Sequence, residues 1–189
     1  MNFLKTIFLT FWLVCVPARA QGEYDRIGFS GFAGPDIRYT LMNGQWHGML
    51  LGGRAGMLIH HAYAIGVAGY SLVNSIDADA PDDQDLSLSY AGLDLNWIIR
   101  PHEPVHGGFK LLVGGGYVSL KDRSVAGDYV NVIEPEWFFE GNVRRWLQIV
   151  LGFSYRFMYR QDRYVNDWDL NQLSIGMMAK FGWFKIAYD

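Results

Sequence analysis

The chain has 189 residues, of which 50% are hydrophobic, 16% are aromatic and 19% are charged, and its formal net charge is −3. The negative balance argues against nucleic-acid binding, which requires a basic patch. The sequence contains one cysteine, Cys15. A disulfide framework within the chain is therefore excluded.

Residues 1–20 have the pattern of a secretory signal peptide. Lys5 gives a positive start, residues 7–16 are apolar, and Ala18-Arg19-Ala20 is a small-residue cleavage site. The apolar run of about ten residues is too short to span a membrane, which takes about twenty. We expect a mature chain that begins near Gln21 and suits one domain, with 14 basic and 19 acidic side chains and no cysteine.

Residues 21–36 are assigned to an N-terminal lead-in and residues 37–189 to a β-barrel domain. Apolar and polar residues alternate with a period of two along much of this domain, which predicts strands. The expected strands are 37–42, 47–59, 63–73, 86–99 and 107–119, then the two strands of a hairpin within 131–160, and finally 171–183. Asn43-Gly44 is a strong hairpin-turn signal. The apolar positions change phase at Gly92, which predicts a β-bulge there.

The hairpin at 131–160 shows the alternation most clearly. Every odd position from Leu147 to Tyr159 is large and apolar or aromatic, which excludes an amphipathic helix. On the preceding strand the even positions carry three glutamates (Glu134, Glu136, Glu140). Pro135 interrupts the ladder, and a bulge there could re-aim Glu134 or Glu136.

Two folds fit such strands. In a soluble sandwich the apolar face is the core, whereas in a transmembrane barrel it meets lipid and the polar face lines the lumen. The strands are about a dozen residues long, against five or six in soluble sheets, and membrane strands need roughly nine to eleven. Interior acids also have basic partners on neighbouring strands, as burial requires. These features favour an eight-stranded antiparallel up-and-down transmembrane β-barrel.

The connections alternate in length along the chain. Those at 60–62, 100–106 and 142–145 are short or contain proline, and those at 74–85, 120–130 and 161–170 are longer and polar. Outer-membrane barrels have short periplasmic turns and longer extracellular loops. The Asn43-Gly44 turn departs from this pattern, but the other connections predict the orientation of the barrel.

Aromatic residues fall near the expected strand ends, where amphipathic rings favour the membrane interfaces. The expected periplasmic girdle contains Tyr63, Trp97, Trp146 and Trp183. The expected outer girdle contains Trp46, Tyr117, Tyr159 and Trp168.

Several short stretches carry a family resemblance: Gly52-Gly53-Arg54-Ala55-Gly56, residues 69–74, Tyr90-Ala91-Gly92-Leu93 and Ser154-Tyr155-Arg156. They resemble an uncharacterised family of small secreted bacterial proteins described as outer-membrane β-barrels. The resemblance covers most of the mature chain and implies the barrel, without an activity or a substrate. Such barrels usually end on an aromatic residue that the assembly machinery reads, whereas this chain ends Ala187-Tyr188-Asp189.

The charged residues on the expected lumen face are the main candidate site. They are Arg38, Arg54, Asp94, Lys110, Glu134, Glu136, Glu140, Arg156 and Lys180. One interpretation is a carboxylate pair for hydrolysis. The other is an ion-pair network that fills the lumen, and it is favoured because an eight-stranded barrel is just wide enough for its own side chains.

Two further clusters are weaker candidates. Asp77, Asp79, Asp82, Asp83 and Asp85 offer carboxylates to calcium, but they lack the glycine and closing glutamate of an EF-hand, so a solvated loop is the simpler interpretation. His60, His61, His102 and His106 lie in two expected turns, where a metal site is less expected than ordinary turn residues.

The sequence thus predicts a monomeric, non-enzymatic outer-membrane barrel with a filled lumen and a structural or surface-interaction role through its acidic loops. Its expected partners are the lipid bilayer and the outer-membrane assembly machinery, and no cofactor is expected. Three alternatives stay open: a soluble periplasmic lipid-binding barrel, a lipid-modifying barrel enzyme and a small pore. The enzyme would need a His, Ser and carboxylate on the outer wall, where His47 stands without a convincing nucleophile.

Overall fold

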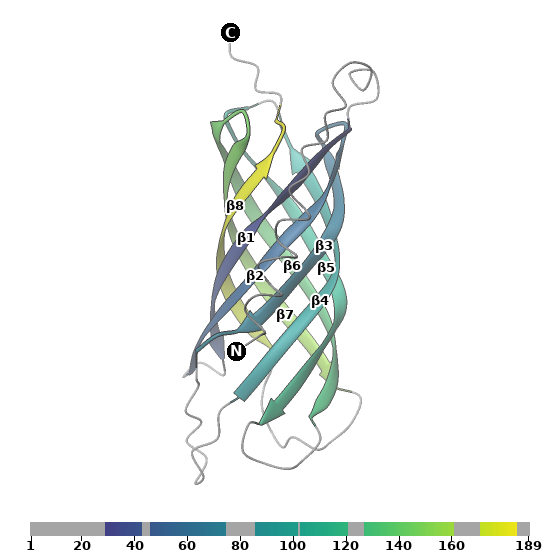
Figure 1. The fold of residues 1–189 in the computed structure, drawn as a ribbon, viewed down its shortest axis with the longest axis vertical. Coiled ribbons are helices and arrows are strands. Elements are labelled where there is room, and N and C mark those ends of the chain that lie inside the picture. Colours follow the sequence, from purple (N-terminus) through teal and green to yellow (C-terminus); the bar gives the residue numbers. More distant parts are fainter. Residues whose placement is uncertain are drawn as a thin grey trace, which may run out of the picture.

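The computed structural model describes residues 29–42, 46–74, 86–101, 103–120, 127–160 and 171–184. Within them, eight antiparallel strands pair in chain order, and β8 pairs with β1 to close a barrel (Figure 1). The strands are β1 (Phe29–Met42), β2 (Trp46–Ile59), β3 (Tyr63–Leu72), β4 (Leu86–Ile99), β5 (Val105–Leu120), β6 (Asp128–Arg144), β7 (Leu147–Arg160) and β8 (Gln172–Gly182). The predicted fold class is confirmed. No helix in the described part of the chain is long and apolar enough to cross a membrane.

β1 begins at Phe29, eight residues before the predicted start at Ile37. Residues 29–36, which the sequence assigned to the lead-in, pair with β2 in unbroken register from Phe29 opposite Ile59. Glycines and Pro35 occupy much of this stretch, so it has few large side chains to show the alternation. Asp36 nevertheless points inward and is fully buried.

The predicted bulge at Gly92 is absent. β4 pairs with β5 without interruption from Leu86 opposite Leu120 to Ile99 opposite Gly107. Leu88 and Tyr90 are buried in the barrel, whereas Leu93, Leu95 and Trp97 face outward. The change of phase therefore reflects a change in what fills the lumen, from apolar to polar side chains, and not a change in the strand.

Pro135 causes no bulge either. It pairs with Leu111 of β5 in continuous register, and its neighbours Glu134 and Glu136 both point inward. In an antiparallel strand each residue bonds to one neighbouring strand, so the missing N–H weakens only the ladder to β7. The register shift between β6 and β7 lies instead between Asn142 and Arg144.

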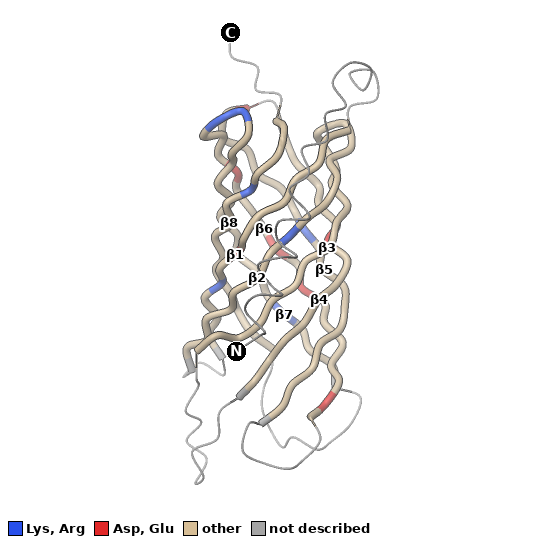
Figure 2. Tube along the Cα trace, viewed as in Figure 1, with Lys and Arg blue, Asp and Glu red and all other residues tan. Residues whose placement is uncertain are grey.

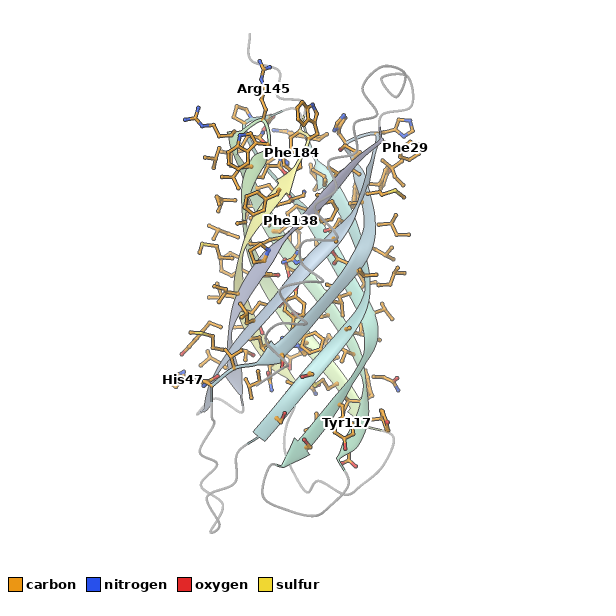
Figure 3. All side chains as sticks on the ribbon, in the orientation of Figure 1. Phe29, His47, Tyr117, Phe138, Arg145 and Phe184 are labelled. Atoms are coloured by element: carbon orange, nitrogen blue, oxygen red, sulfur yellow. The ribbon has the colours of Figure 1, made fainter. Side chains whose placement is uncertain are left out.

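The outer wall is apolar and the interior is layered. Exposed aliphatic and aromatic side chains cover the wall and point away from the barrel (Figure 3). Inside, one apolar cluster includes Leu50, Leu88, Leu112, Val118 and Val132, and a second includes Phe32, Leu58, Phe138, Met178 and Phe184. Charged residues lie between and beside these clusters. This arrangement argues against the soluble lipid-binding alternative, in which the apolar face would enclose a ligand.

The two ends of the barrel differ. The first residues of β1 and the last residues of β8 lie at the end that carries the short turns β2–β3, β4–β5 and β6–β7, here called the short-turn end (Figure 1). In the β2–β3 turn, the Ala62 N–H donates to the Ile59 carbonyl at 3.2 Å, and His60 and His61 have φ values of 50° and 57°. These left-handed values match a two-residue turn of the primed type, which suits the twist of paired strands.

Candidate functional site: the charged lumen

Three buried carboxylates lie in the middle of the lumen: Asp36 on β1, and Glu134 and Glu136 on β6. They meet four cations that are each at most 6% exposed: Arg38, Arg54, Lys110 and Arg156. Acidic and basic positions accordingly lie close together in the middle of the barrel in Figure 2. Period-two alternation in long strands places every one of these side chains on the inner face.

Glu134 accepts bonds at both carboxylate oxygens. Its Oε1 accepts from a guanidinium nitrogen of Arg38 and from the Ser154 hydroxyl, the latter at 2.6 Å. Its Oε2 accepts from the Tyr90 hydroxyl at 2.9 Å and from Arg156 Nε at 3.0 Å. Such saturation stabilises a buried carboxylate, because each donor replaces lost hydration.

Glu136 and Asp36 are held by the remaining cations. Glu136 Oε2 accepts from Arg38 Nη2 at 2.6 Å and from Lys110 Nζ, while its Oε1 lies 3.4 Å from Arg54 Nη2. Asp36 Oδ2 accepts from Arg54 Nε at 2.7 Å, and Arg38 also contacts it. Arg38 therefore bridges all three carboxylates and is the centre of the network.

Two tyrosines join this network to the first apolar cluster. The guanidinium carbon of Arg38 lies 4.3 Å from the centroid of the Tyr70 ring, and that of Arg156 lies 4.5 Å from the centroid of the Tyr90 ring. Tyr70 also donates its hydroxyl to Asp36 at 2.7 Å. The rings thus contact charge on their faces and also belong to the first apolar cluster.

A second, smaller ion pair lies nearer the short-turn end. Lys180 Nζ donates to Glu140 Oε1 at 2.8 Å, and His106 Nε2 lies 3.1 Å from Glu140 Oε2. The prediction that His106 is a turn residue is wrong, because β5 starts at Val105 and turns this ring into the barrel. His60 and His61 do lie in a turn, and His102 lies outside the described residues.

All nine predicted lumen residues point inward, and eight of them form ion pairs within the described part of the chain. The ninth, Asp94, is buried and accepts a hydrogen bond from Asn96 at 3.2 Å. Asp36, Tyr70 and Tyr90 were not among the predicted lumen residues. Asp36 was detectable, because it stands two residues before Arg38 and so shares its face.

The buried cations and carboxylates of the described residues are similar in number. Among the described residues, the four cations Arg38, Arg54, Lys110 and Arg156 meet the three carboxylates Asp36, Glu134 and Glu136, and a fourth carboxylate, Asp94, is also buried. Glu134 and Glu136 are 0% and 2% exposed, and all four of their carboxylate oxygens contact donors. Because protein donors occupy all four oxygens, this geometry favours a packed ion-pair network over a hydrolytic carboxylate pair.

Glycines on the neighbouring strands β7 and β8 leave space for the side chains of the network. A Cβ atom at Gly152 would collide with the carboxylate of Glu136, and one at Gly176 would lie 3.1 Å from Cγ of Arg38. These inward positions must lack side chains because the barrel is just wide enough for those it contains.

The predicted girdle residues whose side chains are described all face outward. At the short-turn end these are Tyr63, Trp97, Trp146 and Trp183, and at the other end Tyr117 and Tyr159. Trp46 starts β2 without a described side chain, and Trp168 lies outside the described residues. Trp137, Phe139 and Tyr129 also face outward and were missed. The stacked rings of Trp146 and Phe181, 6.1 Å apart, extend the belt across β7 and β8.

The predicted calcium loop, Asp77, Asp79, Asp82, Asp83 and Asp85, lies outside the described residues. In the described ranges, no three His, Cys, Asp or Glu side chains are grouped so as to hold a metal ion.

Solved structures share this fold at low sequence identity. Neisserial surface protein A (NspA) aligns with a TM-score of 0.53 and 14% identity over 84% of this chain and 97% of that one. The N-terminal β-barrel domain of Pseudomonas aeruginosa OprF aligns with a TM-score of 0.57 and 7% identity over 83% and 98%. Ail, the attachment invasion locus protein of Yersinia pestis, aligns with a TM-score of 0.50 and 13% identity over 83% and 99%.

No protein family and no curated protein matches the sequence. All three structural neighbours are eight-stranded outer-membrane β-barrel proteins. The chain therefore has the fold of small outer-membrane barrels.

Proposed function

We propose that this protein is a monomeric outer-membrane barrel with a closed lumen, whose role is structural or depends on surface contacts made by its long acidic connections. The observation that carries the proposal is the inversion of the barrel, with charged residues saturated inside and apolar residues exposed outside. In water that outer wall would be a very large exposed apolar surface, which monomeric soluble proteins rarely carry. In a bilayer it is the expected lipid-facing surface.

The packed interior argues for a plug over a pore. Ion conduction needs a continuous aqueous path, whereas here Arg38 links three carboxylates across the barrel and apolar clusters lie on both sides of the network. The likeness to NspA, OprF and Ail supports an outer-membrane location. An interaction role through the loops is supported by the acidic composition of residues 74–85.

The test has two parts. Cell fractionation should place the protein in the outer membrane, and the folded protein should migrate anomalously on a detergent gel until it is boiled. Planar-bilayer recording on the same preparation should then show no steady conductance. A soluble periplasmic protein would contradict the location, and a stable open channel would contradict the closed lumen.

A further inference from the structure

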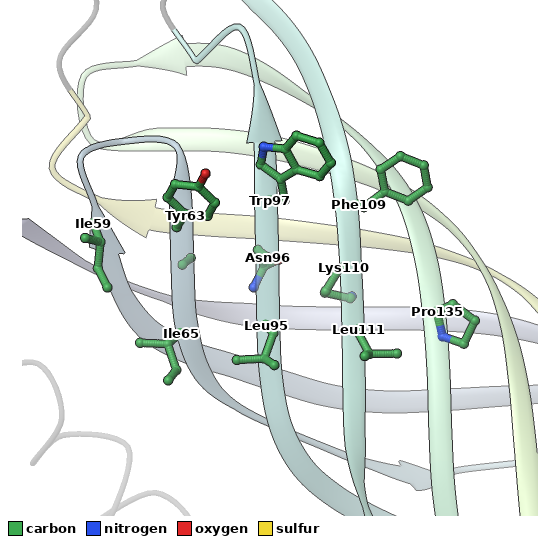
Figure 4. Close-up of a pocket in the computed structure, with 11 residues that line it drawn as sticks. Ile59, Tyr63, Ile65, Leu95, Asn96, Trp97, Phe109, Lys110, Leu111 and Pro135 are labelled. Atoms are coloured by element: carbon green, nitrogen blue, oxygen red, sulfur yellow. The ribbon is translucent and has the colours of Figure 1, made fainter.

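The outer wall carries a groove of about 540 Å³ across β2 to β6, close to the short-turn end (Figure 4). One border is a row of aromatic residues on adjacent strands, in which Tyr63 pairs with Trp97 and Trp97 with Phe109. The other border is an aliphatic row formed by Ile65, Leu95, Leu111 and Pro135, which are paired in the same way.

The groove arises because the side chains of the aromatic row project further from the outer wall than those of the aliphatic row. The side chains of Tyr63 and Trp97 are 56% and 54% exposed, whereas those of Leu95 and Leu111 are each 38% exposed. The residues between the rows, such as Lys110, point into the barrel, so their backbone forms the floor. A tall aromatic row thus stands beside a lower aliphatic row.

The polar atoms of Tyr63 and Trp97 lie on the side of the turns. In Figure 4, the Tyr63 hydroxyl and the Trp97 indole nitrogen lie on the sides of their rings that face away from Ile65 and Leu95. Arg100 follows in the β4–β5 turn with an exposed side chain. Its contact to Glu103 is 3.4 Å long and exposed, and pairs of this kind contribute little to stability.

We propose that this groove binds an acyl chain of one glycerophospholipid from the leaflet at the short-turn end, with Arg100 on the phosphate. The inference rests on the membrane location proposed above. In a bilayer the groove faces hydrocarbon, and leaving it empty would cost its lining their dispersion contacts. Tyr and Trp rings favour the headgroup level, where their O–H and N–H groups meet ester and phosphate oxygens. Arginine matches phosphate through paired hydrogen bonds.

The test uses the full mature chain, folded in detergent, with dioleoylphosphatidylglycerol as the probe and native mass spectrometry as the readout. Wild type should retain one phospholipid. Leu95→Trp and Leu111→Trp place a ring in the groove and should each reduce the retained fraction strongly. Leu93→Trp is the matched control, because Leu93 is the next outward residue of β4 and does not line the groove.

The proposed contact between Arg100 and the lipid phosphate is tested with a second pair of variants. Arg100→Gln should weaken retention roughly tenfold, the loss expected when a charge-assisted hydrogen bond is removed. Arg144→Gln, an exposed cation in the strand end before another turn, should leave it unchanged.

Three outcomes would overturn the proposal: no retained lipid on wild type, equal retention by Leu95→Trp and Leu93→Trp, or retention of added oleate in preference to the phospholipid. A second protein held in the groove in place of lipid would do the same. Every variant is checked for anomalous migration on an unboiled gel. A barrel that migrates as folded and fractionates with the outer membrane but retains no lipid refutes the groove alone, whereas a chain outside the membrane refutes the proposed function.

Discussion

Arg156 Nε donates a hydrogen bond to Glu134 Oε2 at 3.0 Å, and the pairs on either side, Ile133 with Phe157 and Glu136 with Ser154, place the two residues opposite each other across β6 and β7. By itself, the alternation of the hairpin allows this arginine to lie opposite Glu134 or one pair along the strand. The structure shows the first of these registers. The Glu134 carboxylate also accepts hydrogen bonds from Arg38, Tyr90 and Ser154.

Removing Arg156 should destabilise the barrel sharply. Arg156→Ala leaves Glu134 with one cation fewer in a buried site, and breaking a buried pair in this way typically costs about 3–5 kcal/mol. Thermal unfolding in detergent measures the loss, and Arg144→Ala is the exposed control. Arg156→Ala combined with Glu134→Gln should recover part of it in a double-mutant cycle. Unchanged melting of Arg156→Ala would contradict a network that supports the fold.

Gly152 should not tolerate a methyl group. Gly152→Ala places a Cβ atom against the Glu136 carboxylate and should destabilise the barrel by about 1–3 kcal/mol, as overpacking of a filled interior does. Gly141→Ala is the matched control on β6, because no atom lies within 4 Å of its added Cβ. Equal melting temperatures for the two variants would show that the lumen has free space.

A charge in the middle of the outer wall should hinder insertion. Phe153 is 49% exposed on β7, and Phe153→Arg near the midplane should cost about 2–4 kcal/mol. Val143→Arg, at the short-turn end of β6, should cost at most about 1 kcal/mol, since the penalty falls toward the interface. Folding into vesicles of defined lipid measures both. Equal tolerance would mean that the wall does not face lipid.

The orientation can be tested with single cysteines in a Cys15→Ser background. On intact cells a membrane-impermeant maleimide should label Asp79→Cys, in the long connection between β3 and β4, and should leave His61→Cys in the short β2–β3 turn unlabelled. The reason is that short turns face the periplasm in outer-membrane barrels. Labelling of His61→Cys alone would reverse the orientation.

The sequence was informative wherever large side chains alternated. The alternation from Leu147 to Tyr159 identified β7, which spans Leu147–Arg160, because period two is a local property of the chain. The sequence did not predict the strand correctly where the alternating residues were small or where both faces carried residues of the same polarity. Glycine and proline hid the first half of β1, and Leu88 and Tyr90 inside the lumen imitated a bulge.

By itself, then, the sequence determined the strand count, the two faces and most of the charged side chains of the interior. Only the tertiary structure decided which of those charges meet. Arg38 and Glu134 are 96 residues apart in the chain, and they are joined because β1 closes against β8. The stagger of eight strands, the space left by Gly152 and Gly176, and the entry of Asp36 into the network all depend on that closure. Pairing across a closed barrel is a global constraint, and alternation within one strand carries no information about it.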